Sequence, residues 1–194
     1  MSYQELSLAD KIQKHRIKNS LSLEDIASRS ALSRETIAGI EAGTIAPPLG
    51  QIVTLANIFR VTVGELFGDS ADSPFCIARA ADSTRVNRFG SRGNADHYQY
   101  ESLGHKKQNR QMEPFLVTLN PGQTTPQPNQ HIGEEILYVL EGEVEVSLAG
   151  HTDVLGPGDS IYYDSTVPHI VSCHGEEPAR LFAVIYARKE MMIF

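Results

Sequence analysis

The chain of 194 residues has no tryptophan, only two cysteines and no excess of positive charge. Because Cys76 and Cys173 lie outside any CxxC spacing, we expect free thiols and neither a disulfide framework nor a cysteine-bound structural zinc. No apolar run approaches the roughly 20 residues that a membrane helix needs, and the N-terminus lacks the apolar stretch of a secretion signal. We therefore expect a soluble, cytoplasmic protein without a membrane partner.

The net charge of −7 is unevenly distributed along the chain. Up to Gly68, seven basic residues balance seven acidic ones, whereas the remainder holds 10 basic and 17 acidic residues. If any part of the chain binds a polyanion such as DNA, we expect it to be the first part.

The hydrophobic pattern changes near residue 70. Before it, apolar residues recur every three or four positions, as in amphipathic helices. After the polar stretch 68–74, the pattern becomes short β-rich runs separated by proline and glycine turns. The sequence therefore predicts a two-domain chain, α-helical and then all-β. We expect a helical domain over 1–68, a linker with the first strands over 69–112, and the core of the β domain over 113–194.

Two serines mark helix starts in the first domain. Ser22, with Asp25 three residues later, predicts a capping box for a helix that ends near Ser30. Ser33 then caps a second helix after a short turn that contains Leu32. This spacing is typical of a helix-turn-helix, although spacing alone would also suit another small helical bundle.

The residues themselves are more specific than the spacing. SLEDIASRSALSRETIAGIEAG, followed by PP, IVTLANIF and RVTVGELF, resembles the XRE (Cro/cI-like) helix-turn-helix family along residues 12–67. The resemblance implies five helices, binding to double-stranded operator DNA, and recognition by the helix that Ser33 opens. The alternative is a degenerate helix-turn-helix that is kept only as a scaffold. The positions implied for DNA contact are Ser33, Arg34, Glu35, Thr36 and Ala38, with Lys18 and Ser33 on phosphates.

The second domain alternates cleanly in EVEVSLAGHTDVL, where Val144, Val146 and Leu148 share one face. Successive hairpins of this kind close best as a β-barrel or jelly roll. PG at 121–122, HIGEEILYVLEGEVEV and LGPGDSIYYDSTVPH resemble the cupin superfamily, which implies a cupin barrel.

Two residues of the first cupin motif predict a polar site. If residues 129–135 form a strand, Asn129, His131 and Glu135 share one face of it. The cupin resemblance adds His169 as the last ligand, and two imidazoles with one carboxylate are ligands that suit Fe, Mn, Ni or Zn. Most metal-binding cupins have histidine where this chain has Asn129. The alternative is a metal-free sensory pocket in which Glu135 anchors a histidine.

Tyr98 and Tyr100 lie on the same side of a predicted strand. They are either ligand-binding groups of the pocket, together with Asn129, or residues of an amphipathic edge. The chain also resembles the hydroxypropylphosphonate epoxidases. These enzymes have a helical domain, a YxY pair and a His-x3-Glu motif with a distal histidine. The lysine by which those enzymes reach substrate corresponds to Ser20, with Lys18 two residues away.

Two functions follow from these resemblances. The first is a homodimeric DNA-binding transcription regulator whose cupin domain senses a small-molecule effector. The alternative is a non-haem, metal-dependent cupin oxidoreductase. We favour the regulator over the enzyme because the helix-turn-helix pattern is complete and the catalytic set is not.

Overall fold

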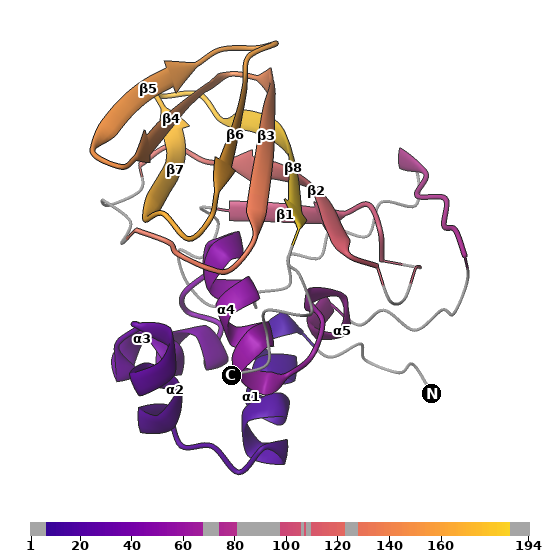
Figure 1. Cartoon of the computed structure of the whole chain (residues 1–194), viewed down its shortest axis with the longest axis vertical. Coiled ribbons are helices and arrows are strands. Elements are labelled where there is room, and N and C mark those ends of the chain that lie inside the picture. Colours follow the sequence, from indigo (N-terminus) through magenta and orange to yellow (C-terminus); the bar gives the residue numbers. More distant parts are fainter. Residues whose placement is uncertain are drawn as a thin grey trace.

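The order of elements follows the change of pattern near residue 70 (Figure 1). Among the described residues, helices come first and antiparallel strands second. Most of the segment expected to be a linker, 69–112, lies outside the description. None of the described helices is long and apolar enough to cross a bilayer. The structure, a computed structural model, describes residues 7–67, 74–80, 98–105, 107, 110–122 and 128–186.

The helical unit begins its elements where the serines predict. Ser22 Oγ accepts from the Asp25 amide at 3.0 Å, and Asp25 Oδ2 accepts from the Ser22 amide at 2.8 Å, so the expected capping box is present. Ser33 Oγ accepts from the Thr36 amide at 3.1 Å and starts the next helix. Within the described residues the helices are α1 (Leu8–Lys18), α2 (Leu23–Ser30), α3 (Arg34–Glu41), α4 (Leu49–Phe59) and α5 (Val63–Phe67).

One apolar core holds these helices together. Its fully buried side chains come from every helix, which explains the spacing of three and four in the sequence. Burial of such side chains is the main stabilising contribution in a unit of this size. The fully buried large residues are Ile12, Ile26, Ile37, Ile40, Ile52, Leu55 and Leu66.

The strands form two antiparallel sheets. A five-stranded sheet has the order β1-β2-β8-β3-β6, and a three-stranded sheet has the order β5-β4-β7. Val144 and Val146 of the predicted hairpin are buried, and Leu148 is partly buried on the same face. The strands are β1 (Tyr98–Ser102), β2 (Met112–Leu119), β3 (Glu134–Glu141), β4 (Glu143–Leu148), β5 (His151–Leu155), β6 (Ser160–Asp164), β7 (His169–His174) and β8 (Ala179–Tyr186).

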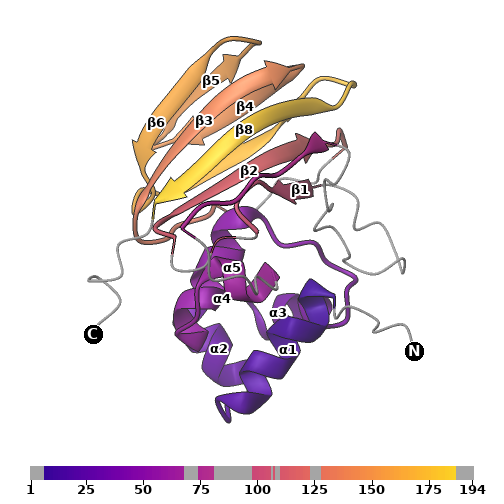
Figure 2. The ribbon, with the colours of Figure 1, turned by 90° about the vertical axis from the view of Figure 1, so that its right-hand side faces the viewer.

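The helical unit lies against one end of the sheets, with α4 and α5 on the facing side (Figures 1 and 2). Phe67 at the end of α5 meets Phe115 of β2 with ring centroids 5.3 Å apart. Thr54 Oγ1 of α4 also reaches the Gln130 carbonyl at 3.5 Å. The helical unit and the strand unit therefore contact each other directly.

Candidate functional site

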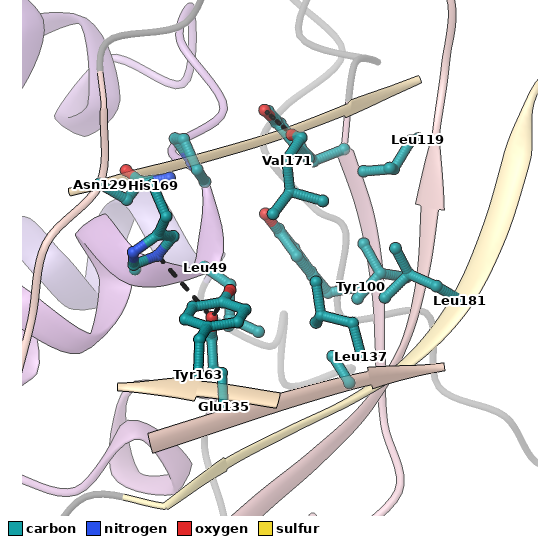
Figure 3. A pocket seen from close by; sticks show the side chains of 15 residues that line it. Leu49, Tyr100, Leu119, Asn129, Glu135, Leu137, Tyr163, His169, Val171 and Leu181 are labelled. Atoms are coloured by element: carbon teal, nitrogen blue, oxygen red, sulfur yellow. Dashed lines mark hydrogen bonds and ion pairs between the residues drawn. The ribbon is translucent and has the colours of Figure 1, made fainter. Parts of the chain in front are cut away.

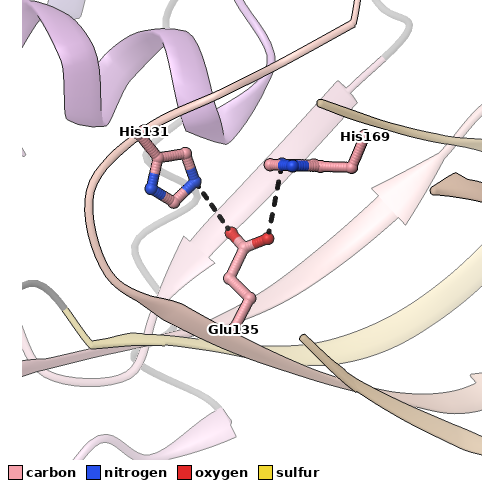
Figure 4. A group of neighbouring side chains, drawn as sticks. All are labelled: His131, Glu135 and His169. Carbon is pink, nitrogen blue, oxygen red and sulfur yellow. Dashed lines mark ion pairs between the residues drawn. The ribbon is translucent and has the colours of Figure 1, made fainter. Parts of the chain in front are cut away.

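Two histidines and a glutamate meet inside the strand unit (Figure 4). His131 precedes β3, Glu135 is the second residue of β3, and His169 begins β7. His131 Nε2 lies 3.6 Å from Glu135 Oε1, and His169 Nε2 lies 3.7 Å from Glu135 Oε2. Their ligand atoms all lie within 4.8 Å of one another, and the three side chains are buried. The structure therefore brings together all three residues expected as metal ligands.

His131 reaches the site from an irregular segment and not from the strand that the sequence predicts. Residues 129–133 are not part of a regular strand, because β3 begins only at Glu134. An isolated bridge instead joins Asn129 to His169, with backbone hydrogen bonds of 2.7 and 2.9 Å. The His131 amide donates to the Ser165 carbonyl at 2.9 Å. These bonds, rather than strand alternation, align His131 with Glu135.

Hydrogen bonds set the orientation of His169. Its Nδ1 lies 2.8 Å from the Val167 carbonyl, so Nδ1–H donates and Nε2 is left as the acceptor that faces the site. In metal sites, a hydrogen bond from the ring nitrogen that does not bind the metal usually orients the imidazole. Burial is the main cause that lowers the pKa of His169, which keeps the ring neutral.

Glu135 is held as a carboxylate in a buried place. Burial alone would raise its pKa, but the neighbouring His131, with further contributions from Tyr163 and His169, outweighs burial and lowers it. The Tyr163 hydroxyl donates to Glu135 Oε2 from the opposite position on β6. Burial and the Glu135 charge raise the pKa of Tyr163, so its proton stays on the phenol.

The donor set fits a divalent metal ion. His131 Nε2 is buried without a hydrogen-bond partner in the described structure, although it faces the carboxylate. A buried polar atom left in this way normally has an unseen partner. A carboxylate with a neutral imidazole beside it has the protonation state that metal binding requires.

A cavity of about 50 Å³ adjoins this group (Figure 3). Glu135, His169 and Asn129 line its polar end, and apolar side chains from both sheets form most of the rest. Its described lining contains no lysine or arginine. Asn129, the third polar residue expected at the pocket, therefore lies in its wall. The other lining residues are Pro48, Leu49, Gly50, Tyr98, Tyr100, Val117, Leu119, Leu137, Tyr163, Val171, Leu181 and Ala183.

Tyr98 and Tyr100 both lie on the cavity wall. They are buried, their rings are nearly parallel at 3°, and their centroids are 6.1 Å apart. The Tyr98 hydroxyl donates to the Val171 carbonyl at 3.3 Å, and the Tyr100 hydroxyl to the Pro47 carbonyl at 3.5 Å. Burial raises the pKa of Tyr100 well above its usual range, so it stays protonated. Both hydroxyls therefore donate hydrogen bonds to backbone carbonyls beside the pocket.

The residues expected to contact DNA lie on and around α3. Arg34, Glu35 and Ala38 are exposed, Thr36 is half-buried, and Lys18 is exposed at the end of α1. Arg34 Nε forms an ion pair of 2.6 Å with Glu24 Oε1 of α2, and both side chains are more than half exposed. Exposed pairs of this kind contribute little, so Arg34 is free to leave Glu24. The hydroxyl of Ser33 is engaged in the N-cap.

Sequence reasoning missed two components of the pocket. Tyr163 is opposite Glu135 in the β3–β6 register, and the paired tyrosines of SIYYD were the only local signal for it. The second component is Pro48–Gly50, at the start of α4 in the helical unit. Nothing in the sequence of this segment indicated a role in a cupin pocket.

Comparisons with known proteins agree with this architecture. Residues 12–66 match the family model described as helix-turn-helix, and residues 115–185 match that of the cupin domain. The chain therefore combines a helix-turn-helix domain of the XRE type with a cupin domain.

The chain is similar in sequence to two known proteins and in fold to a solved structure. It is 26% identical over 174 residues to the HTH-type transcriptional regulator PuuR of Escherichia coli (strain K12), covering 89% of this chain and 90% of PuuR. It is 29% identical over 171 residues to the (S)-2-hydroxypropylphosphonic acid epoxidase of Streptomyces wedmorensis, covering 82% and 85%. The crystal structure of an HTH_3 family transcriptional regulator from Vibrio cholerae has the same fold, with a TM-score of 0.62, 20% identity, and coverage of 94% and 96%.

Proposed function

We propose that the protein is a sequence-specific DNA-binding transcription regulator whose cupin domain binds a small effector. The observation that carries the proposal is the complete helix-turn-helix, with the first turn of α3 exposed, in the same chain as a buried pocket. The similarity to PuuR along most of both chains supports it. We assign DNA binding to residues 1–68 and the effector site to the cupin barrel that we infer the two sheets form.

Arg34 is the side chain that we expect to read a base. It is the first residue of α3, and its guanidinium can donate two hydrogen bonds to guanine. Glu35, Thr36 and Ala38 would complete the groove-facing surface. Lys18 would contact phosphates. The Ser33 cap would do the same, because its neighbouring amides lie at the N-terminus of α3.

We infer that the pocket takes a small ligand with an oxygen donor. Its described lining is mostly apolar, with Glu135 as the one charged side chain among these residues, and Tyr98, Tyr100 and Asn129 supply neutral polar groups. A divalent ion such as Fe, Mn, Ni or Zn would be held by His131, Glu135 and His169. Such an ion supplies a Lewis acid that attracts an oxygen ligand. Without it, the Glu135 charge disfavours any anion.

A homodimer in the cytoplasm completes the proposal. A single helix-turn-helix without net positive charge makes few contacts, and regulators of this type bind two half-sites as dimers. The outer face of the five-stranded sheet offers a surface for a second copy, since Ile136, Tyr138 and Tyr162 are 38%, 43% and 63% exposed.

An oxidoreductase is the second candidate. The similarity to the epoxidase and the shared His131, Glu135 and His169 pattern support it. The described pocket lining has no cationic side chain to meet a phosphonate, and Ser20 stands where those enzymes have lysine. We therefore expect no epoxide when the protein is loaded with Fe(II) without oxygen and then given (S)-2-hydroxypropylphosphonate and air. Robust turnover would establish the enzyme instead.

Selection from random duplex DNA tests the main proposal. The full-length protein should enrich a pseudo-palindromic site, and fluorescence anisotropy should show tighter binding to that site than to a scrambled duplex at one salt concentration. No enrichment, or equal affinity for both duplexes, would rule out a sequence-specific regulator.

A further inference from the structure

The helical domain forms one wall of the cupin pocket. Pro48, Leu49 and Gly50, at the start of α4, line the same cavity as Glu135 and His169. The contact at Gly50 is close: a Cβ added there would meet Cδ2 of His131 at 2.9 Å and Cβ of Asn129 at 3.0 Å. Real Cβ atoms essentially never approach another atom below 3.0 Å. The backbone of α4 therefore lies directly on a residue of the candidate metal site.

The strands that line the pocket are tied together by their backbones, whereas the start of α4 is not tied to them in this way. β2 pairs with β8, and β8 with β3, in antiparallel ladders of backbone hydrogen bonds. The start of α4 is held to the cupin side by side-chain contacts, including long hydrogen bonds of 3.5 Å from Tyr100 to Pro47 and from Thr54 to Gln130. Among the described residues, no side chain caps α4, whose N-cap is Pro48. A ligand that needs more room will displace α4 before it opens the sheets.

The cavity is small for a ligand pocket. Ligand pockets usually measure about 300–1,000 Å³, whereas this cavity measures about 50 Å³. An effector of ordinary size therefore needs more room than the present walls enclose.

The far side of α4 belongs to the helix-turn-helix core. Ile52 and Leu55 of α4 are fully buried, and α4 packs against α2. A close-packed core transmits a rigid shift and does not absorb it. A displacement of the first turn of α4 therefore moves α2 and, with it, α3.

We propose that the first turn of α4, residues 48–50, is the movable wall of the effector site, so that occupation of the cupin pocket repositions the helix-turn-helix. The inference rests on the proposed function and names its regulation. By linkage, whatever occupies the pocket and whatever fixes the helical domain change each other's affinity by the same factor.

Cobalt(II) is the first probe, because its visible spectrum reports the ligand set. Calorimetry on the full-length protein should show that Gly50→Ala lowers Co²⁺ affinity by about tenfold, as ligand-orienting changes do. Gly156→Ala is the matched control, since a Cβ there meets only Asp159 Oδ2 at 3.8 Å. Hydrogen exchange in the first turn of α4 should change about fivefold or more when Co²⁺ binds wild type. Equal Co²⁺ affinity in both variants together with unchanged exchange would overturn the proposal.

A second arm does not need a metal. Ala183→Leu, or the smaller Ala183→Val, fills the cavity from β8, and Val184→Leu adds bulk to the opposite face of the same strand. The Ala183 variants should speed exchange in the first turn of α4 about fivefold or more, while β2 and β8 stay protected. Val184→Leu should not. If wild type binds no Co²⁺, the metal part of the proposed function fails and this arm decides; unchanged exchange at α4 would then overturn the movable wall.

Discussion

The guanidinium of Arg16 donates hydrogen bonds to both carboxylate oxygens of Glu41. Arg16 Nε lies 2.6 Å from Oε1 and Nη2 lies 2.8 Å from Oε2, while Nη1 donates to the Leu21 carbonyl at 3.1 Å. The Glu41 side chain is only 6% exposed. This paired contact ties α1 to the last residue of α3, so it helps to hold the recognition helix in place.

Removing Arg16 should therefore destabilise the helical domain. Arg16→Ala leaves the buried Glu41 carboxylate without its partner, and the free energy of unfolding should fall by about 3 kcal/mol. Urea denaturation followed by circular dichroism measures the change. Arg29→Ala, on the last turn of α2, is the control and should have little effect. A loss no larger than the control's would show that the pair is not a stabilising contact.

Arg34 and Glu24 should affect DNA binding in opposite directions. Arg34→Ala should weaken binding to the selected site by about 1–3 kcal/mol, because a guanine contact is lost. Glu24→Gln frees Arg34 and removes a negative charge near DNA, so it should tighten binding. Anisotropy on specific and scrambled duplexes separates base reading from charge. If Arg34→Ala weakened binding to both duplexes equally, Arg34 would be a phosphate contact only.

Metal analysis of the purified protein tests the His131, Glu135 and His169 group. We expect about one divalent ion per chain, lost in His131→Ala, Glu135→Ala and His169→Ala because each removes one of three ligands. Tyr163→Phe, which removes the hydroxyl that bonds Glu135, should weaken binding by about tenfold. His151→Ala serves as the control, since His151 pairs with Asp153 on the surface. Stoichiometric metal in all three single variants would place the ion elsewhere.

Mild acid should destabilise the helical domain through His15. Burial, with Lys18 and Lys14 nearby and Glu65 opposing them, lowers the pKa of this histidine. The folded state then takes up its proton less readily than the unfolded state, so the free energy of unfolding should fall as pH drops below about 6.5 and through the lowered pKa. His15→Gln should show a weaker fall between pH 7.5 and 5.5. Identical pH profiles for both proteins would contradict this assignment.

Substitution on the outer sheet face should dissociate the dimer. Tyr162→Glu places a charge where we infer a second copy, and light scattering should detect monomers that bind the palindromic site far more weakly. Val154→Glu is the control, because Val154 is also an exposed apolar residue but lies on the three-stranded sheet. A Tyr162→Glu dimer of unchanged stability would move the interface away from this face.

Local patterns in the sequence determined much of this protein. The Ser22–Asp25 capping box and the Ser33 cap are formed within four residues, so sequence alone predicts them. The alternation of Val144 and Val146 likewise needs only the period of a strand. Family motifs then identified His131, Glu135 and His169 before any geometry was known.

Tertiary structure alone decided how these parts form a site. His131 reaches Glu135 from an irregular segment, aligned by bonds to Ser165 and by the Asn129–His169 bridge, and the expected strand alternation was wrong there. Tyr163 meets Glu135 through strand register, and Gly50 meets His131 across two domains. Such contacts join residues far apart in the chain. They depend on how whole elements pack, which no short stretch of sequence encodes.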